Sequence, residues 1–166
     1  MGEREPAAAR DASRYAVRVA TAADLPALAH CRERWAAEWA DPRSRPEGPD
    51  PRFVDALSRW WEGTEGHRHT WLAFDAEAPV GMASLLEHER MPWPHRPSGR
   101  WGYVAQVWVE PARRRRGVAR ALMDELAGWG AARGLERLLV NPSEQSRQFY
   151  AASGFEPTVM FRRDLR

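Results

Sequence analysis

The sequence contains no lysine, so all 25 of its basic residues are arginines. They face 23 acidic residues, which leaves a formal net charge of only +2. Nucleic-acid-binding domains rely on a strong positive field, so a balance this close to neutral does not favour that class. The absence of lysine is typical of a biased genomic base composition and by itself indicates no function.

Cysteine is almost as scarce. Cys31 is the only one, which excludes an intramolecular disulfide and fits a reducing compartment. Its place in a predicted helix favours a small buried side chain over a nucleophile. The sequence also lacks a run of about 18 apolar residues and the apolar core of a signal peptide. We therefore expect a cytoplasmic protein without a membrane anchor.

Metal-ligand patterns are missing as well. His67 and His69 have strand-like spacing, but no third ligand accompanies them, so we expect no metal site. The length of 166 residues suits one domain with a buried core. We expect residues 1–13 to be a disordered tail and residues 14–166 to form a single domain.

Apolar periodicity and turn residues predict an alternating order of elements. A capping box, Thr21 to Asp24, opens the first helix, and four prolines mark residues 41–51 as a loop. The predicted strands cover residues 15–19, 70–74, 80–88, 104–109, 137–140 and 160–165. The predicted helices run to about residue 39 and over residues 52–62, 118–133 and 143–153.

The segment from Val104 to Ala119 carries the clearest chemical signal. Val104–Val109 is rich in β-branched and aromatic residues, which favours a buried strand, and Pro111 ends it. Gly117 permits a backbone conformation that a Cβ would obstruct, and a helix with Gly134 as its stop follows. Free N–H groups in such a turn and at the helix N-terminus bind anions.

In this setting Arg114-x-x-Gly117-x-Ala119 resembles the signature of the GNAT superfamily of acetyl-CoA-dependent N-acetyltransferases. A second segment, with Phe149-Tyr150 and Gly154-Phe155, is similar to the C-terminal signature of that family. The resemblance implies an α/β (α+β) GNAT fold, with a mixed central β-sheet and helices on both faces. The implied order is β-α-α-β-β-β-α-β-α-β, which the predicted elements match.

The resemblance also implies the residues that bind acetyl-CoA. Backbone groups of the Arg114–Ala119 turn would hold the pyrophosphate, and those of Val107 and Val109 would face the pantetheine arm and the acetyl carbonyl. Tyr150 would protonate the departing thiolate, unless it only packs on the pantetheine. Ser143 replaces an asparagine that contacts the cofactor in many members, so it either binds the cofactor or caps a helix. The full set of candidate cofactor-binding residues is Val107, Trp108, Val109, Arg114, Arg115, Arg116, Gly117, Val118, Ala119, Asn141, Ser143, Ser146 and Tyr150.

The general base is less well indicated. Some relatives carry a glutamate where this chain has Tyr103, which is a poor base at neutral pH. Glu87 and Glu89 share one face of a predicted strand and are candidate catalytic residues acting through a water, unless they are merely solvated. The tryptophans of the first two helices either line an acceptor pocket or pack in the core; they are Trp35, Trp39, Trp60 and Trp61.

Taken together, the resemblance implies transfer of an acetyl group from acetyl-CoA to a primary amine of a small molecule or of a peptide or protein. The reaction would proceed by direct transfer in a ternary complex, without a metal. Two alternatives stay open: a non-catalytic acyl-CoA sensor of the same fold, and a nucleic-acid-binding domain that uses the arginine run at residues 113–116. The sequence does not determine which amine is the acceptor or whether the protein forms a homodimer.

Overall fold

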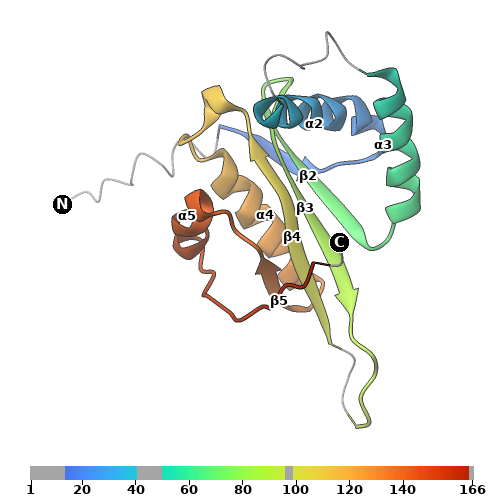
Figure 1. Ribbon diagram of the computed structural model, residues 1–166, viewed down its shortest axis with the longest axis vertical. Helices are drawn as coiled ribbons and strands as arrows, with labels where there is room; N and C mark the ends of the chain where they lie inside the picture. Colours follow the sequence, from blue (N-terminus) through green and yellow to red (C-terminus); the bar gives the residue numbers. More distant parts are fainter. Residues whose placement is uncertain (1–13, 41–49, 96–98, 165–166) are drawn as a thin grey trace, which may run out of the picture.

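The computed structural model describes residues 14–40, 50–95 and 99–164. Its centre is a five-stranded sheet in the order β1-β2-β3-β4-β5 (Figure 1). The strands are β1 Ala16–Val19, β2 Arg68–Asp75, β3 Ala78–Glu89, β4 Arg100–Val109 and β5 Leu135–Val140. The helices are α2 Leu25–Trp39, α3 Pro51–Thr64, α4 Val118–Ala132 and α5 Arg147–Ala152. Short 3₁₀ helices precede other elements: η1 Ala22–Asp24 leads into α2, η2 Pro111–Arg113 into the turn before α4, and η3 Glu144–Ser146 into α5.

The sheet is mixed. The first three pairings are antiparallel, whereas β5 runs parallel to β4. Parallel neighbours need a long crossover, and α4 supplies it. The carboxyl ends of β4 and β5 therefore lie at the same edge of the sheet, and the segments that follow both strands meet there.

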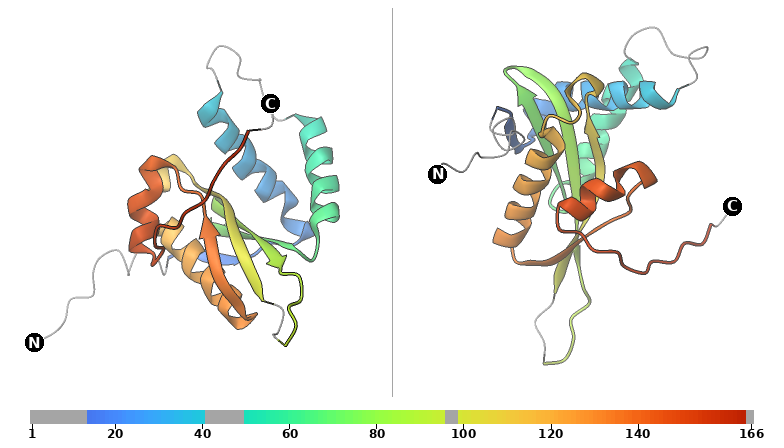
Figure 2. Two further views of the ribbon diagram at one scale, coloured as in Figure 1. Left: turned by 60° about the horizontal axis from the view of Figure 1, so that its bottom comes forward. Right: turned by 90° about the vertical axis from the view of Figure 1, so that its left-hand side faces the viewer.

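Helices cover both faces of the sheet (Figure 2). On one face α4 packs on a core that contains Trp71, Leu85 and Leu122, together with Tyr150 of α5. On the other face α2 and α3 pack on Leu72, Met82 and Trp108. Successive strand residues point to opposite faces, so each strand contributes to both cores. The predicted α/β architecture with helices on both faces is confirmed.

Local signals in the sequence placed several helix ends correctly. Thr21 and Asp24 form the capping box, with the Thr21 N–H donating to the Asp24 carboxylate at 2.9 Å. Arg18 donates two further hydrogen bonds to that carboxylate, which are the main cause of its pKa lying well below the ordinary value. Gly134, with φ at 75°, follows the C-terminus of α4 as expected. The predicted tail at residues 1–13 and loop residues 41–49 lie outside the described residues.

The closing strand predicted at residues 160–165 was wrong as far as the structure describes it. Residues 155–164 form no strand, and Leu165 lies outside the described residues. Val159 is 80% and Phe161 96% exposed, so these apolar side chains reach neither core. The segment leads away from the sheet in Figure 2. A short apolar run forms a stable strand only where an edge and a buried face receive it, and here neither does.

Candidate functional site

The strands β4 and β5 part at the edge where the site lies. The register pairs Val104 with Val140, and β5 ends there. Within the described part of the chain, residues 105–109 of β4 have no strand partner besides β3. Their other edge therefore leaves backbone polar groups without a strand partner, and the contact with a cofactor implied for Val107 and Val109 stays a proposal. The side chains of Val107 and Val109 meanwhile pack against the core under α4.

Gln106 marks the point at which β4 changes course. Its φ is 56°, a left-handed value that is rare for residues other than glycine, and the register with β3 shifts beside it. A bulge of this kind bends the strand and redirects its side chains. Gln106 was not predicted from the sequence, because no residue type signals a bulge in an otherwise apolar strand.

The turn at residues 114–117 has the geometry of an anion cradle. Arg115 and Gly117 have φ values of 61° and 86°, so the backbone enters the left-handed region twice before α4 begins. The Ala121 N–H is the first in α4 to bond backward, to the Gly117 carbonyl at 2.9 Å. Within the residues that the structure describes, the N–H groups from Arg115 to Arg120 have no acceptor. Unpaired N–H groups at a helix N-terminus attract phosphate.

Another glycine brings β3 close to the turn. A Cβ on Gly81 would lie 3.0 Å from the Val118 Cγ1 and 3.1 Å from the Trp108 carbonyl oxygen. Glycine therefore allows the first turn of α4 to pack directly on β3 beside the end of β4. This packing places the N-terminus of α4 next to Val107–Val109.

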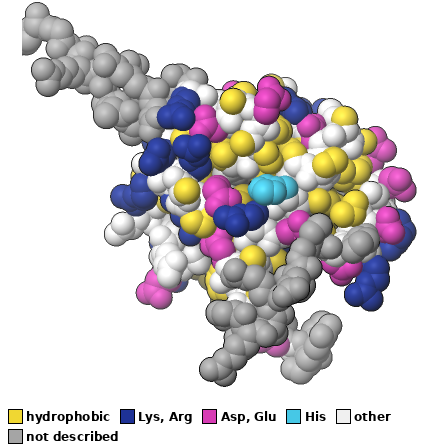
Figure 3. Space-filling model, turned by 90° about the horizontal axis from the view of Figure 1, so that it is seen from above, with side chains coloured by type: hydrophobic (Ala, Val, Ile, Leu, Met, Phe, Trp, Pro, Cys, Tyr) yellow, Lys and Arg dark blue, Asp and Glu magenta, His cyan; other side chains and the backbone are white. Residues whose placement is uncertain are grey.

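The four consecutive arginines at residues 113–116 divide into two pairs. Arg113 forms an ion pair with Asp75 at 2.9 Å, and Arg114 forms one with Glu38 at 2.6 Å. Arg114 Nε also donates to the Val109 carbonyl at 3.0 Å. Arg115 and Arg116 have no carboxylate partner in the described part of the chain. The first pair thus fixes the turn, and the second pair is available to an anion. Figure 3 shows Arg side chains gathered along one side of this end of the molecule.

The segment after β5 brings the remaining predicted residues to the same edge. Asn141 directly follows β5. Ser143 occupies the N-cap position of η3, but its hydroxyl donates to Ser146 Oγ at 3.0 Å and makes no capping hydrogen bond. Ser146 Oγ in turn donates to the Ser143 carbonyl at 3.0 Å. The two serines therefore bond to each other, and their predicted contact with a cofactor stays a proposal.

Tyr150 is buried in the same core as Val109 and Val118. Its ring stands edge-on to Phe149 and Phe155. Burial, and secondarily the nearby Tyr103, raise the pKa of Tyr150 to about 12. The phenol is therefore protonated at neutral pH, as a proton donor must be.

Glu87 and Glu89 do not join this site. Glu87 is opposite Gly102, five residues before Val107 on β4, which is roughly 17 Å along the strand. Its buried carboxylate pairs with Arg100 at 2.8 Å and approaches Arg133 and His69 at 3.5 and 3.4 Å. Glu89 lies farther along β3 and is exposed. Both glutamates lie too far away to contact an amine beside Val107.

Cys31 is fully buried, and burial raises the pKa of its thiol to about 12. It is thus the small buried side chain that the sequence favoured. Within the described ranges, no group of three or more His, Cys, Asp or Glu is placed to hold a metal ion. None of the helices described is both long and apolar enough to cross a membrane.

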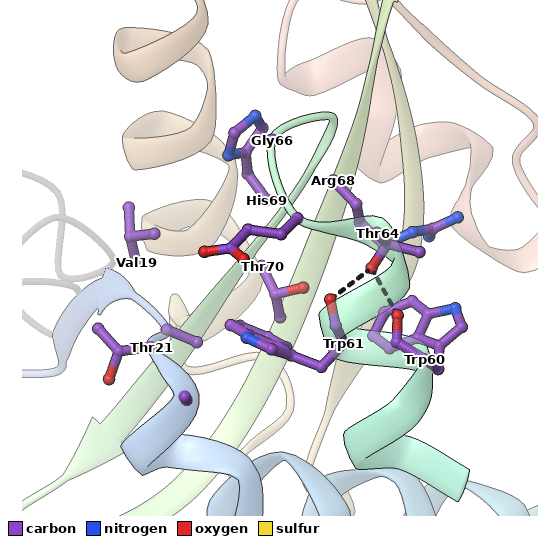
Figure 4. Close-up of a pocket in the computed structure, with 12 residues that line it drawn as sticks. Val19, Thr21, Trp60, Trp61, Thr64, Gly66, Arg68, His69 and Thr70 are labelled. Atoms are coloured by element: carbon purple, nitrogen blue, oxygen red, sulfur yellow. Dashed lines mark hydrogen bonds between the residues drawn. The ribbon is translucent and has the colours of Figure 1, made fainter.

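Two cavities lie between the helices and the sheet. The larger, about 390 Å³, opens where β1 and β2 meet the end of α3, and Trp61, Arg68 and Thr70 line it (Figure 4). The smaller, about 240 Å³, lies between α2, α3 and the sheet, and its lining includes Arg32, Ser84 and Gln106. Only the smaller one includes a residue of β4, directly before Val107. Trp60 lines both cavities, whereas Trp39 is 81% exposed and lines neither.

Comparison with known proteins agrees with this geometry. The model of the Acetyltransferase (GNAT) family matches residues 31–155. A GCN5-related N-acetyltransferase from Ralstonia eutropha superposes with a TM-score of 0.67 at 27% identity, covering 91% of this chain and 98% of the other. A predicted acetyltransferase with acetyl-CoA from Clostridium acetobutylicum gives 0.70 at 20% identity, covering 90% and 94%.

An aminoglycoside acetyltransferase from an uncultured soil metagenomic sample, in complex with sisomicin, gives a TM-score of 0.69 at 14% identity. That match covers 93% of this chain and 98% of the other. No curated protein matches the sequence. Because the family model spans most of the chain and the fold agrees, this protein belongs to the GNAT family of acetyltransferases.

Proposed function

We propose that this protein transfers an acetyl group from acetyl-CoA to the primary amine of a small molecule or peptide, directly and within a ternary complex. The observation that carries the proposal is the turn before α4, whose unpaired N–H groups from Arg115 to Arg120 lie beside the unpaired end of β4. A pyrophosphate suits the first feature, and an extended amide-containing arm suits the second.

In this proposal the turn holds the pyrophosphate, and Arg115 and Arg116 add positive charge. Residues 107–109 bind the pantetheine arm and polarise the acetyl carbonyl through the backbone. Such preorganised donors stabilise an oxyanion, and loss of one costs about 2.7–4 kcal/mol in comparable sites. Tyr150 donates a proton to the departing thiolate and regains one from solvent, while the attacking nitrogen loses its extra proton to solvent as the amide forms. Asn141, Ser143 and Ser146 lie where they can border the cofactor.

The acceptor would enter the 240 Å³ cavity, which reaches Gln106 from the face opposite α4. Since Glu87 and Glu89 are remote, we assign no side-chain base, and the amine reacts as the neutral species. The remoteness of these two glutamates also sustains the alternative of a non-catalytic acyl-CoA sensor. The cytoplasmic location rests on the sequence alone.

Two measurements test the function. Acetyl-CoA should raise the melting temperature, because a ligand at 100 times its Kd stabilises the folded state by about 2.7 kcal/mol. Thiol release from acetyl-CoA across a panel of small amines and peptides should then reveal turnover. Binding without release from any amine would support the sensor instead. A melting temperature raised by DNA or RNA but not by acetyl-CoA would refute both acyl-CoA roles.

A further inference from the structure

The smaller cavity contains one charged side chain, Arg32 of α2. Apolar and aromatic side chains form most of the remaining wall, including Leu28, Phe53 and Trp60. Ser84 is buried, and its hydroxyl is already paired with Thr70 at 3.0 Å. Apart from the indole of Trp60, the polar side chains left for a ligand are therefore those of Arg32 and Gln106.

Arg32 has no carboxylate partner among the residues that the structure describes. Its recorded contact is with the ring of Trp35, with the guanidinium carbon 4.9 Å from the ring centroid. Partial burial lowers the pKa of Arg32, although its charge is kept at any physiological pH. A partly buried cation without an anion is unfavourable, and an anionic ligand would relieve this cost.

Two other charged residues of α2, Arg34 and Glu38, are paired, unlike Arg32. Arg34, two residues along, donates to both carboxylate oxygens of Glu110 at 3.1 and 2.6 Å. Glu38 is bound by Arg114 and by the Trp108 indole. Arg34 and Glu38 thus tie α2 to the end of β4, whereas Arg32 lines the cavity.

We propose that Arg32 binds a carboxylate of the acceptor, so that the substrate is a small apolar amine that also carries an acid group. This inference rests on the proposed function, because it names the substrate of the same site. The planar guanidinium matches a carboxylate with two parallel hydrogen bonds. One arginine balances the single charge of a carboxylate but not the nearly double charge of a phosphate.

The size of the cavity limits the rest of the molecule. A volume of about 240 Å³ accommodates an amino acid with an apolar side chain, but not a folded protein segment. The aromatic and aliphatic wall favours branched or aromatic side chains over charged ones. Leucine and phenylalanine are therefore suitable probes.

The test compares each amino acid with its carboxamide. The carboxamide loses its ammonium proton more readily, so without recognition of the acid it would be the better acceptor. We expect wild-type kcat/KM to favour leucine over leucinamide at least about tenfold. Arg32→Met should lower kcat/KM for leucine by about 10- to 100-fold, mainly through KM, because a hydrogen bond to a charged group is lost. Leucinamide should be affected by less than about threefold.

Arg59→Met is the matched control. Arg59 is an exposed residue of α3 without a carboxylate partner in the described part of the chain. Its substitution should leave kcat/KM unchanged for both leucine and leucinamide. Arg32→Lys should restore part of the preference for the acid. Equal use of acid and carboxamide, or no effect of Arg32→Met, would overturn the inference while leaving acetyl transfer intact.

If no amine is acetylated, a binding measurement still tests whether Arg32 binds a carboxylate. 4-Methylpentanoate, which is leucine without its amine, is titrated calorimetrically into the CoA-bound protein. Binding that disappears in Arg32→Met and survives in Arg59→Met supports the carboxylate site, even if the enzymatic proposal fails. Absence of saturable binding in the wild type would refute it.

Discussion

Arg114 donates from Nη2 to both carboxylate oxygens of Glu38, at 2.8 and 2.6 Å. The Arg114 side chain thus fastens the turn to α2, while the backbone N–H groups from Arg115 to Arg120 stay unpaired within the described residues. Burial alone would raise the pKa of Glu38, but hydrogen bonds from Arg114 and Trp108 outweigh it and lower that pKa. The carboxylate is therefore charged at neutral pH and connects α2, β4 and the turn.

Substitution of Glu38 by glutamine should loosen this connection. The amide oxygen can still accept from the Trp108 indole, but the ion pair with Arg114 is lost. Because Arg114 is partly exposed, we expect a loss of about 1 kcal/mol, or roughly 2–4 °C in melting temperature. Acetyl-CoA should also bind a few-fold more weakly. A double-mutant cycle with Arg114→Gln checks the coupling, and strictly additive losses would contradict it.

Substitution of Gly117 should separate backbone strain from cofactor binding. Its φ of 86° makes Gly117→Ala unfavourable by about 1–2 kcal/mol. Gly134 at the other end of α4 has φ 75°, so Gly134→Ala is the matched control for strain. Both variants should melt at similarly lower temperatures, whereas only Gly117→Ala should weaken acetyl-CoA binding.

Gly117→Glu, which adds a negative charge, should abolish acetyl-CoA binding while the protein stays folded. Unchanged affinity of this variant for acetyl-CoA would remove the turn from the cofactor site.

Arg115 and Arg116 provide a test of charge without a structural effect. Since neither has a carboxylate partner in the described part of the chain, Arg115→Gln with Arg116→Gln should change stability by less than about 0.5 kcal/mol. The Kd for acetyl-CoA should rise and depend less on salt than in the wild type. Arg113→Gln, which removes the ion pair with Asp75, should act mainly on stability instead. Unaltered salt dependence in the double variant would show that these two arginines are only solvated.

Tyr150→Phe should lower kcat by about 100-fold or more, because general acids contribute 10²–10⁴ in rate. The Kd for acetyl-CoA should stay nearly constant, since the ring is retained. With the pKa of Tyr150 at about 12, its protonated form persists across the assay range, so the wild-type rate should rise with pH as the acceptor amine loses its proton. Tyr103→Phe is the control and should retain most of the activity. Full turnover by Tyr150→Phe would exclude a catalytic role.

Sequence reasoning succeeded where one residue determines local structure. Gly117, Gly134 and the pair Thr21 and Asp24 each act within one turn of chain, and the structure confirms the helix ends that they predicted. It failed for residues 160–164, because a strand depends on a partner that an apolar run does not specify. It also could not find Gln106, Glu38 or Arg32. Gln106 lies at a bulge, Glu38 pairs with an arginine 76 residues away in sequence, and Arg32 lacks a carboxylate partner in the described part of the chain. None of these features leaves a local sequence pattern.

The position of α2 has a mechanical consequence for the two substrates. Arg32 and Glu38 are six residues, or about 9 Å, apart on one rigid helix. Arg32 lines the smaller cavity, and Glu38 holds the turn before α4; in the proposed function these are the acceptor and donor sites. A ligand that stiffens either end therefore restricts the motion of the other, and thermodynamic reciprocity makes this influence equal in both directions. In the proposed function, α2 is thus a rigid connection between the two substrate sites.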